Sequence, residues 1–415
     1  MVAAAGDTLG LYISIPFCRS KCTYCNFASG VYPASEHARN IDRLIEDLRA
    51  APAWAQQIGA ELPRRVDTIY LGGGTPSLLA PELVERLFAA MRAEFDVDAD
   101  AEVTVECAPG QLSEETLQAY VAAGVNRVSF GVQSFIDREA AVSGRLHNRS
   151  VVLSEITRLQ AAGITNLNVD LIAGLAGQDF ASWQESLAVL VDTGVPHTSI
   201  YMLEVDQDSR LGRELLAHGT RYHAGLVPTD DAMAEMYSVA IERLDAAGLE
   251  QYEISNFSRP GFNSRHNLRY WQRRPYLGLG LDASSMLHET RNGNGPGRVL
   301  RATTIDDLQA YLAGAEPVES AWFTPAQQHE EAWFLGLRLN AGVEIAAVER
   351  EFGPALVAPA LDAVTRLAEA GLLVSDNGTV RLTPRGRLLS NDVFEEFLSQ
   401  TPEPNHAIGP VQERR

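Results

Sequence analysis

The sequence predicts an α/β protein in which an incomplete (β/α)6 barrel is followed by a small C-terminal winged-helix-like domain. Short β-branched runs alternate with longer amphipathic runs over the first half of the chain, which is typical of a parallel sheet with helices packed around it. From Thr324 onward the pattern changes to three helices and a hairpin. With 415 residues and 46% hydrophobic content, the chain is long enough to build more than one core.

Six strands are expected in the barrel, at residues 11–15, 67–71, 102–106, 127–131, 166–171 and 198–203. A helix candidate follows each strand, for example 81–94 after the second strand and 181–192 after the fifth. Six such units suit an incomplete barrel better than a closed one, which has eight.

The rest of the chain divides into three parts. A barrel extension at 206–322 follows the partial barrel of residues 1–205, and it carries a helix candidate at 230–247 and a short strand at 252–255. In the C-terminal domain, 323–400, the third helix is expected near 355–370. Strands at 372–375 and 379–382 flank Asp376-Asn377-Gly378, a strong hairpin signal. The tail, 401–415, is expected to be disordered.

Charge and composition exclude several classes of protein. The formal net charge of -20 opposes binding to bulk DNA or RNA. The third helix of the C-terminal domain is apolar, so regulatory DNA binding is a distant third hypothesis. The N-terminus lacks a signal-peptide pattern, so a cytoplasmic location is expected. Three of the 4 cysteines lie within eight residues, which is the wrong arrangement for a disulfide framework.

The central motif is Cys18-Arg-Ser-Lys-Cys22-Thr-Tyr-Cys25, in the loop directly after the first strand. Thiolates are the ligands of iron-sulfur clusters, and three of them around a 4Fe-4S cube leave one iron open for an outside ligand. The alternatives are a zinc site completed by Cys107 or a histidine, or a buried cluster of free thiols.

Further candidates follow the later strands. Gly72-Gly73-Gly74-Thr75-Pro76 lets the backbone approach a ligand closely, although it lacks the patterns of phosphate-binding loops. Polar residues also stand at the carboxyl ends of strands, where barrel sites form: Glu106, Gln133 and Asp170, with Arg145 in a nearby loop. Each residue taken alone is explained by a structural hydrogen bond, whereas the four together can bind a zwitterion and a ribose.

The cysteine spacing, the aromatic Tyr24 before the third cysteine and the glycine run together resemble the radical-SAM superfamily, whose members bind S-adenosylmethionine (SAM) at the open iron. Within it the chain is similar to the haem chaperone family HemW, a relative of the oxygen-independent coproporphyrinogen III oxidase HemN. The segments that carry this resemblance run in order along nearly the whole chain: YISIPFCRSKCTYCNF, YLGGGTPS, NRVSFGVQSF, GRLH, NVDLIAGLAGQ, YEISNF, HNLRYW, LGLRL and LTPRGRLLSNDVFEEFL.

The resemblance implies a 4Fe-4S cluster on Cys18, Cys22 and Cys25, and a set of SAM contacts. Those contacts are Tyr12, Gly73, Gly74, Thr75, Glu106, Gln133, Arg145 and Asp170, with Tyr24 also counted among the cofactor-binding residues. Phe27 stands where the oxidase has a further cysteine, so coproporphyrinogen oxidase activity is not expected.

His266-Asn267-Leu-Arg-Tyr270-Trp271 matches the H-N-x-x-Y-W motif associated with haem in this family. Imidazole is a common axial ligand of haem iron, and Tyr270 and Trp271 offer flat apolar surface to a porphyrin. The alternative is a hydrogen-bonded histidine beside packed aromatic rings.

Four positions depart from the family pattern. Ser14, Ser264 and Ser284 stand where the family commonly has histidine, cysteine and histidine, and Cys107 stands where it more often has another residue. The three serines remove one thiol and two imidazoles from the candidate iron ligands.

Two functions of different class remain. The first is a haem chaperone that carries haem as cargo to haem-requiring apoproteins, membrane-bound respiratory enzymes among them, with a homodimer as one state to consider. The second is a radical-SAM enzyme that forms a 5'-deoxyadenosyl radical and acts on a porphyrin or another substrate.

Overall fold

The computed structural model describes residues 8–290, 297–315 and 319–398. The expected six strands are present and parallel, with most of them extending further than predicted. They are β1 (Leu9–Ile15), β2 (Arg65–Gly73), β3 (Asp96–Cys107), β4 (Arg127–Gln133), β5 (Asn166–Ala173) and β6 (His197–Met202). The expected tail at 401–415 lies outside the described residues.

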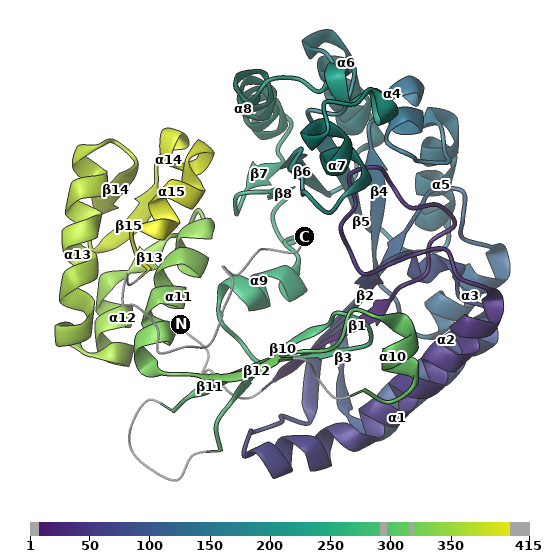
Figure 1. Cartoon of the computed structure of the whole chain (residues 1–415), viewed down its shortest axis with the longest axis horizontal. Helices are drawn as coiled ribbons and strands as arrows, with labels where there is room; N and C mark the ends of the chain where they lie inside the picture. The colour runs from purple at the N-terminus through teal and green to yellow at the C-terminus, as the bar shows by residue number, and fades with distance from the viewer. Residues whose placement is uncertain (1–7, 291–296, 316–318, 399–415) are drawn as a thin grey trace.

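Helices cover the outer side of these strands (Figure 1). They are α1 (Ala34–Ile58), α2 (Pro81–Glu94), α3 (Glu114–Ala122), α4 (Asp137–Val142), α5 (Arg149–Ala161) and α6 (Phe180–Thr193), with the 3-10 turn η1 (Pro76–Leu78) before α2. The predicted helix 81–94 has the observed bounds of α2, and 181–192 falls inside α6.

The sheet does not close on itself, as predicted. Its order is β12-β11-β10-β9-β1-β2-β3-β4-β5-β6-β8-β7, so strands from the middle of the chain extend both edges. On one edge β9 (Tyr276–Leu279) runs parallel to β1, and β10 (Ser284–His288), β11 (Val299–Thr303) and β12 (Glu319–Phe323) continue antiparallel. On the other edge, β8 (Asn256–Ser258) and β7 (Glu250–Gln251) are antiparallel to their neighbours.

Residues alternate along the parallel strands with period two. On β4, Val128, Phe130 and Val132 pack into the core under the helices, whereas Arg127 and Ser129 lie on the opposite face. A parallel strand with helices on one side only must present its other residues to the interior of the barrel. The inner face of the sheet is therefore polar, and candidate site residues lie on it.

The prediction of a strand at 252–255 is wrong. Gln251 of β7 pairs with Phe257 of β8, so these residues form the connection of a hairpin rather than a strand. The Tyr252 N–H donates to Asn256 O (3.1 Å), which closes the connection, and the Tyr252 hydroxyl bonds His197 (2.9 Å). Tyr252 thus faces the barrel interior, whereas Ile254 packs with the core of the C-terminal helices and Glu253 forms only an isolated bridge to Leu339.

The middle region also contains α7 (Arg210–Leu216), η2 (Arg221–Leu226), α8 (Asp230–Ala246), α9 (Arg265–Trp271) and α10 (Leu308–Leu312). The helix predicted at 230–247 corresponds to α8. Helix α9 lies between the barrel and the C-terminal helices (Figure 1). None of the helices in the described part of the chain is both long and apolar enough to span a membrane.

The C-terminal region has the predicted order of three helices and a hairpin. They are α11 (Pro325–Arg338), α12 (Ile345–Phe352), α13 (Pro354–Glu369), β14 (Leu373–Asp376) and β15 (Thr379–Leu382), with β13 (Val343–Glu344) pairing on β15. Asn377 and Gly378 have φ of 50° and 77°, as the two-residue turn requires. Two short helices follow, α14 (Pro384–Leu388) and α15 (Ser390–Glu395). The winged-helix assignment itself stays a prediction.

A buried ion pair fixes α9 to the sheet. The guanidinium of Arg269, whose side chain is 0% exposed, pairs with Asp67 of β2, and it also donates to Pro275 O (2.7 Å) and Thr8 O (3.1 Å). Arg274 donates to the second oxygen of Asp67 (2.8 Å). Both carboxylate oxygens are therefore occupied, which is the condition under which a buried charge is tolerated.

Replacing Asp67 by alanine should cost about 3–5 kcal/mol of unfolding free energy, because it leaves the Arg269 guanidinium buried without its counter-charge. Urea unfolding measures this loss. Asp96→Ala serves as the control, since Asp96 and Arg64 are 3.7 Å apart and largely exposed, and it should cost less than about 1 kcal/mol. Equal small losses in both variants would contradict the structural role of the pair.

Candidate functional site

The loop after β1 carries the three clustered cysteines, and two other segments hold it in place. The Leu211 N–H of α7 donates to Thr23 O (2.8 Å), and the Thr23 N–H donates to Ser143 O (3.1 Å) after α4. Arg210 donates to Lys21 O (2.7 Å). The loop is therefore fixed from the β4 and β6 sides, at the carboxyl ends of the strands.

The cysteine thiols lie near one another and near a positive charge. Burial raises the pKa of Cys18 and of Cys25, and the neighbouring Cys22 raises both further. Arg145 donates to Cys22 Sγ (3.4 Å), and the Thr75 hydroxyl donates to Cys18 Sγ (3.7 Å). A guanidinium beside sulfur favours the thiolate, which is the form that binds iron.

The three thiols supply the donor chemistry that a 4Fe-4S cluster uses. Each thiolate of a 4Fe-4S cluster binds a different iron, so its sulfurs stand farther apart than the ligands of one metal ion. Across residues 8–290, 297–315 and 319–398, no three His, Cys, Asp or Glu side chains come close enough to hold one ion. Cys107 belongs to the hydrophobic core outside the sheet, where burial raises its pKa to about 12.

The glycine run lies against the start of the cysteine loop. A Cβ on Gly74 would stand 2.7 Å from Ile15 O, and Gly73 adopts a φ of 89° with Ser14 Oγ 2.7 Å from where its Cβ would be. The Thr75 N–H donates to Phe17 O (2.7 Å). Side chains at these glycines would separate the two loops, so the close approach requires their absence.

Glu106 lies at the end of β3, inside the barrel, and accepts a hydrogen bond from the Tyr70 hydroxyl (2.9 Å). Burial raises the pKa of Glu106 to about 7, and the charge of Asp170 raises it as well. Tyr12 stacks on Tyr70 with ring centroids 6.1 Å apart. Tyr12, Tyr70, Glu106 and Asp170 are each partly exposed, so this part of the interior reaches solvent.

Gln133 has features of a ligand-binding residue. It adopts a φ of 71°, unusual for a residue other than glycine, at a register shift in the pairing of β4 and β5. Its Oε1 atom is buried without a hydrogen-bond partner within the described ranges. Backbone strain beside an unpaired polar atom is common where a ligand completes the site.

Arg145 and Asp170 complete this group. Arg145 donates to Gly131 O, and although burial alone would lower its pKa, the nearby Tyr24 and Cys22 raise it. Asp170 on β5 accepts from Asn168 (2.7 Å) and Ser129 (3.3 Å), while burial raises its pKa.

Tyr24 joins this group through its polar end. Its ring packs against the apolar cluster of Ile172, Leu175, Leu203 and Leu211, and its hydroxyl bonds Cys22 and lies near Arg145. The structure brings the other predicted SAM and cluster residues together on the inner face and at the carboxyl ends of β1 to β5.

His266 is buried, and both ring nitrogens are hydrogen-bonded. Nδ1 bonds the Thr68 hydroxyl (2.9 Å) and Nε2 bonds the Tyr270 hydroxyl (2.8 Å). Burial lowers the pKa of His266 to about 3, and Arg269 and Arg127 lower it as well. The structure thus has the hydrogen-bonded histidine that was the alternative to a free ligand, with the ring held neutral at pH 7.

The other three motif residues of α9, Tyr270, Trp271 and Asn267, have different surroundings. Tyr270 packs edge to face on Tyr276, with centroids 4.7 Å apart. Trp271 lies under the guanidinium of Arg338 from α11, 4.2 Å from the ring centroid, and its Nε1 is buried without a partner among the described residues. Asn267 is partly exposed.

The departures from the family pattern have local explanations in two cases. Ser264 is the N-cap of α9 and accepts from the Asn267 N–H (3.3 Å), a role that serine fills well. Ser14 lies beside Gly73, where a larger side chain would crowd the glycine run. Ser284 is exposed and bonds Thr303 (3.1 Å). Phe27 is 41% exposed at the edge of the cysteine loop.

Sequence reasoning missed several residues of the interior. Tyr70, Ser129 and Asn168 bond the predicted residues, and Glu102 accepts from the backbone N–H groups of Arg265 (3.0 Å) and His266 (2.9 Å). The period-two alternation of each strand could have identified them, because they share a face with the residues that were predicted.

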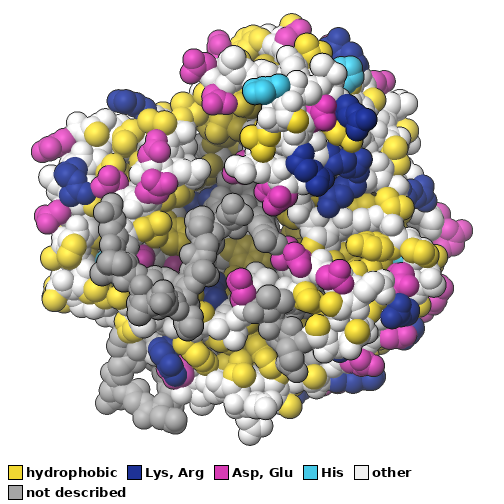
Figure 2. Space-filling model, in the orientation of Figure 1, with side chains coloured by type: hydrophobic (Ala, Val, Ile, Leu, Met, Phe, Trp, Pro, Cys, Tyr) yellow, Lys and Arg dark blue, Asp and Glu magenta, His cyan; other side chains and the backbone are white. Residues whose placement is uncertain are grey.

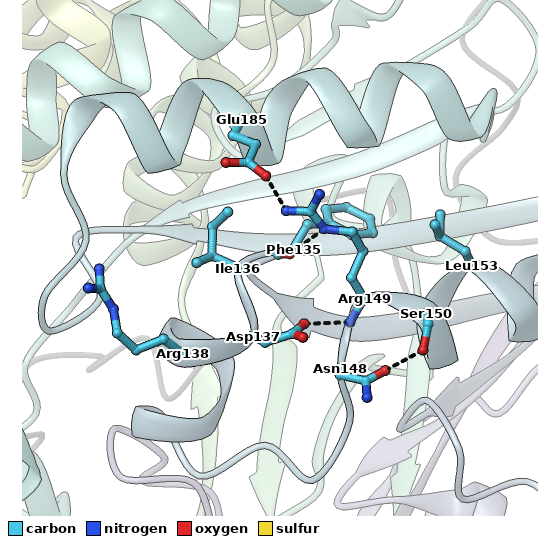
Figure 3. Close-up of a pocket in the computed structure, with 9 residues that line it drawn as sticks. All are labelled: Phe135, Ile136, Asp137, Arg138, Asn148, Arg149, Ser150, Leu153 and Glu185. Carbon is cyan, nitrogen blue, oxygen red and sulfur yellow. Dashed lines mark hydrogen bonds and ion pairs between the residues drawn. The ribbon is translucent and has the colours of Figure 1, made fainter.

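A surface pocket of about 590 Å³ lies on the outer side of the barrel, between α4, α5 and α6 (Figure 3). Three of its charged residues already bond one another: Arg149 donates to Glu185 through its guanidinium and to Asp137 (2.7 Å) through its backbone N–H. It contains none of the predicted site residues, so the interior of the barrel remains the candidate site.

Cys22→Ala should abolish the cluster, because only two thiols remain at the loop. Iron and sulfide content after anaerobic reconstitution, together with the visible absorption of the cluster, measures this. Cys107→Ala is the matched control and should keep full content, since its thiol lies in the core outside the sheet. Retention of the cluster in Cys22→Ala, or its loss in Cys107→Ala, would contradict the assignment.

Comparison with known proteins agrees with this geometry. The family model of the Radical SAM superfamily matches residues 12–190, and that of the HemN C-terminal domain matches residues 323–389. The solved structure of coproporphyrinogen III oxidase (HemN) from Escherichia coli has a TM-score of 0.78 and 22% identity, covering 95% of this chain and 91% of that one. This likeness confirms the fold, and the superfamily match brings with it a 4Fe-4S cluster and SAM.

Two curated relatives are more similar in sequence. The protein named Heme chaperone HemW from Lactococcus lactis is 32% identical over 392 residues, covering 93% of this chain and 96% of the relative. The HemW protein from Mycobacterium tuberculosis is 35% identical over 399 residues, covering 95% of each. With such identity over nearly the full length of its relatives, the chain belongs to the haem chaperone family HemW.

Proposed function

We propose that this chain is a haem chaperone, which binds haem inside its barrel beside the cluster and SAM and transfers it to haem-requiring apoproteins. The observation that carries the proposal is the position of the HNxxYW helix α9, whose His266 projects into the same interior as Glu106 and Asp170. The ring of His266 lies 5.2 Å from that of Tyr70, which itself bonds Glu106.

Haem iron would bind His266 through Nε2. A neutral imidazole is the form that ligates metals, and the low pKa of His266, about 3, keeps it neutral throughout the physiological range. Nδ1 would keep its bond to Thr68, which fixes the orientation of the ring. The Tyr270 hydroxyl must then leave Nε2. Tyr270, Trp271 and Asn267 are proposed to contact the porphyrin.

At the carboxyl end of the barrel, Cys18, Cys22 and Cys25 are proposed to hold the cluster, with SAM on the open iron. The partly exposed carboxylates and the unpaired Oε1 of Gln133 support SAM binding by the residues named earlier. The proposed SAM contacts are Tyr12, Tyr24, Gly73, Gly74, Thr75, Glu106, Gln133, Arg145 and Asp170.

The domain boundaries, the recipients, the location and the oligomeric state of the protein are also proposals. The chain is divided at 205 and 322 into a partial barrel, an extension and a C-terminal domain. Its recipients include membrane-bound respiratory enzymes, which it meets from the cytoplasm, and it can act as a homodimer. On the face shown in Figure 2, Asp and Glu side chains are spread widely and one group of Lys and Arg lies near α7. With a net charge of -20, this distribution supports protein recipients rather than nucleic acid.

A radical-SAM enzyme is the second candidate function. It is favoured by the complete cysteine loop with its glycine run, which a haem carrier alone would not need. Phe27, in place of a further cysteine, argues against coproporphyrinogen oxidation. Production of 5'-deoxyadenosine from SAM by the reduced protein distinguishes this enzyme from the chaperone.

The proposed function predicts opposite effects of two substitutions in α9. His266→Ala should lower haem affinity at least about tenfold, because it removes the iron ligand. Tyr270→Phe should raise it several-fold, because iron no longer has to displace a hydrogen bond worth about 1 kcal/mol. Difference absorbance titrations of the reconstituted protein measure both affinities. Unchanged affinity in His266→Ala would exclude this ligand, and absence of haem binding to the wild type would exclude the function.

SAM binding should depend on the ionisation of Glu106. Since the pKa of Glu106 is about 7, the carboxyl is mostly neutral at pH 6 and mostly anionic at pH 8. The anion attracts the cationic SAM, so affinity should rise about tenfold between these pH values. Isothermal titration calorimetry measures it, and Glu106→Gln should bind weakly with little change across this range. A flat profile in the wild type would contradict the role of Glu106.

A further inference from the structure

Arg127 is a buried cation for which the described residues provide no ion-pair partner. It begins β4 and is 2% exposed. Its Nε is buried without a hydrogen-bond partner, and within the described part of the chain no carboxylate forms an ion pair with its guanidinium. The buried Arg269 is different, since it has Asp67 beside it. An arginine buried without a counter-ion is costly, which calls for a function that needs it.

The guanidinium points into the barrel. Arg127 shares the inner face of β4 with Ser129, which bonds Asp170. Burial is the largest influence on the pKa of Asp170, Tyr70 and His266, and the charge of Arg127 lowers the pKa of all three. These residues come from β5, β2 and α9, so Arg127 lies among groups that converge from three sides of the interior.

Two neighbours of Arg127 also have unused polar atoms. In the sheet register Thr104 of β3 and Asn166 of β5 lie directly beside Arg127. The Thr104 Oγ1 and Asn166 Oδ1 atoms are buried without partners in the described ranges. The Thr104 hydroxyl and the Arg127 guanidinium can both donate to one anion, whereas the Asn166 oxygen can only accept a hydrogen bond. The planar guanidinium in particular matches a carboxylate.

The SAM contacts at the far ends of the strands do not account for this arrangement, although the proposed contact Asp170 lies nearer to Arg127. Gln133, at the SAM end of β4, is six residues beyond Arg127, which corresponds to about 20 Å along the strand. Arg127 instead lies near His266, where the haem iron is proposed to bind. Haem carries two propionate carboxylates at one edge of its ring.

We infer that Arg127, with the Thr104 hydroxyl beside it, receives a propionate carboxylate of the haem whose iron His266 binds. This inference rests on the proposed function and adds a second attachment point to it. Free energy that the fold loses by burying the guanidinium is recovered when the anion binds, so the site selects ligands that carry a carboxylate.

The test compares haem with haem dimethyl ester, which lacks the free carboxylates, on the cluster-reconstituted full chain. The wild type should bind haem about ten- to hundredfold more tightly than the ester. Arg127→Met should lose that preference while binding the ester as the wild type does, and Arg127→Lys should restore part of it. Arg265→Met removes an arginine whose bond to Asp100 O is at the surface, and should leave both affinities unchanged.

Two further measurements on Arg127→Met distinguish a ligand-binding role of Arg127 from a structural one. The melting temperature of ligand-free Arg127→Met should equal or exceed that of the wild type, because a buried unpaired charge is replaced by an apolar side chain. SAM affinity of the variant should stay within about twofold.

Several outcomes would overturn the inference. In Arg127→Met, the affinities for haem and for the ester could fall equally, or the melting temperature could fall markedly. The affinity for SAM could also fall while the preference for haem over the ester persists. If the wild-type protein binds haem and the ester with equal affinity, the inference is overturned but the proposed function is not. Wild type that binds neither overturns the proposed function with it.

Discussion

The functional geometry of this protein depends on the one-sided covering of its parallel sheet. Helices cover the outer face, whereas the short helix α9 meets the inner face at β2, so every second residue of β1 to β6 faces the interior. Those positions hold Tyr12, Tyr70, Glu106, Arg127 and Asp170. A closed hydrophobic core would have required apolar residues at the same positions. The polar inner face is therefore the feature from which the cofactor and cargo sites follow.

One interior serves two proposed ligands. The rings of Tyr12, Tyr70, His266 and Tyr270 follow one another, with centroid separations of 6.1, 5.2 and 5.2 Å. Glu106 bonds Tyr70, the second ring of this series, and α9 provides the last two rings and is held by Arg269 and Asp67. A ligand that moves any of these rings changes the surroundings of the next. SAM and haem are therefore expected to influence one another through direct contact of side chains rather than over a distance.

The sequence allowed the fold and the cluster loop to be predicted, because both depend on local patterns. Strand periodicity located all six barrel strands, and the spacing of Cys18, Cys22 and Cys25 indicated iron-sulfur chemistry. The connection at Tyr252 was mistaken for a strand, since Tyr252 and Ile254 are held by packing on the barrel and on the C-terminal core and not by pairing along a strand.

The buried contacts of α9 could not be predicted in the same way. His266 meets Thr68, and Arg269 meets Asp67, across about 200 residues of sequence, and no local signal links such distant positions. Arg127 was overlooked for the same reason: in the sequence it is an ordinary strand residue, and only the fold shows that no carboxylate of the described residues forms an ion pair with it.

The central claim is that haem and the cluster occupy one barrel, with haem on His266. Iron anomalous diffraction from crystals of the haem-loaded, reconstituted protein tests it most directly. The account predicts two separate iron positions in each chain, one at the three clustered cysteines and one within coordination distance of His266 Nε2. A haem iron peak outside the barrel, or haem iron found only where the cluster is missing, would contradict it.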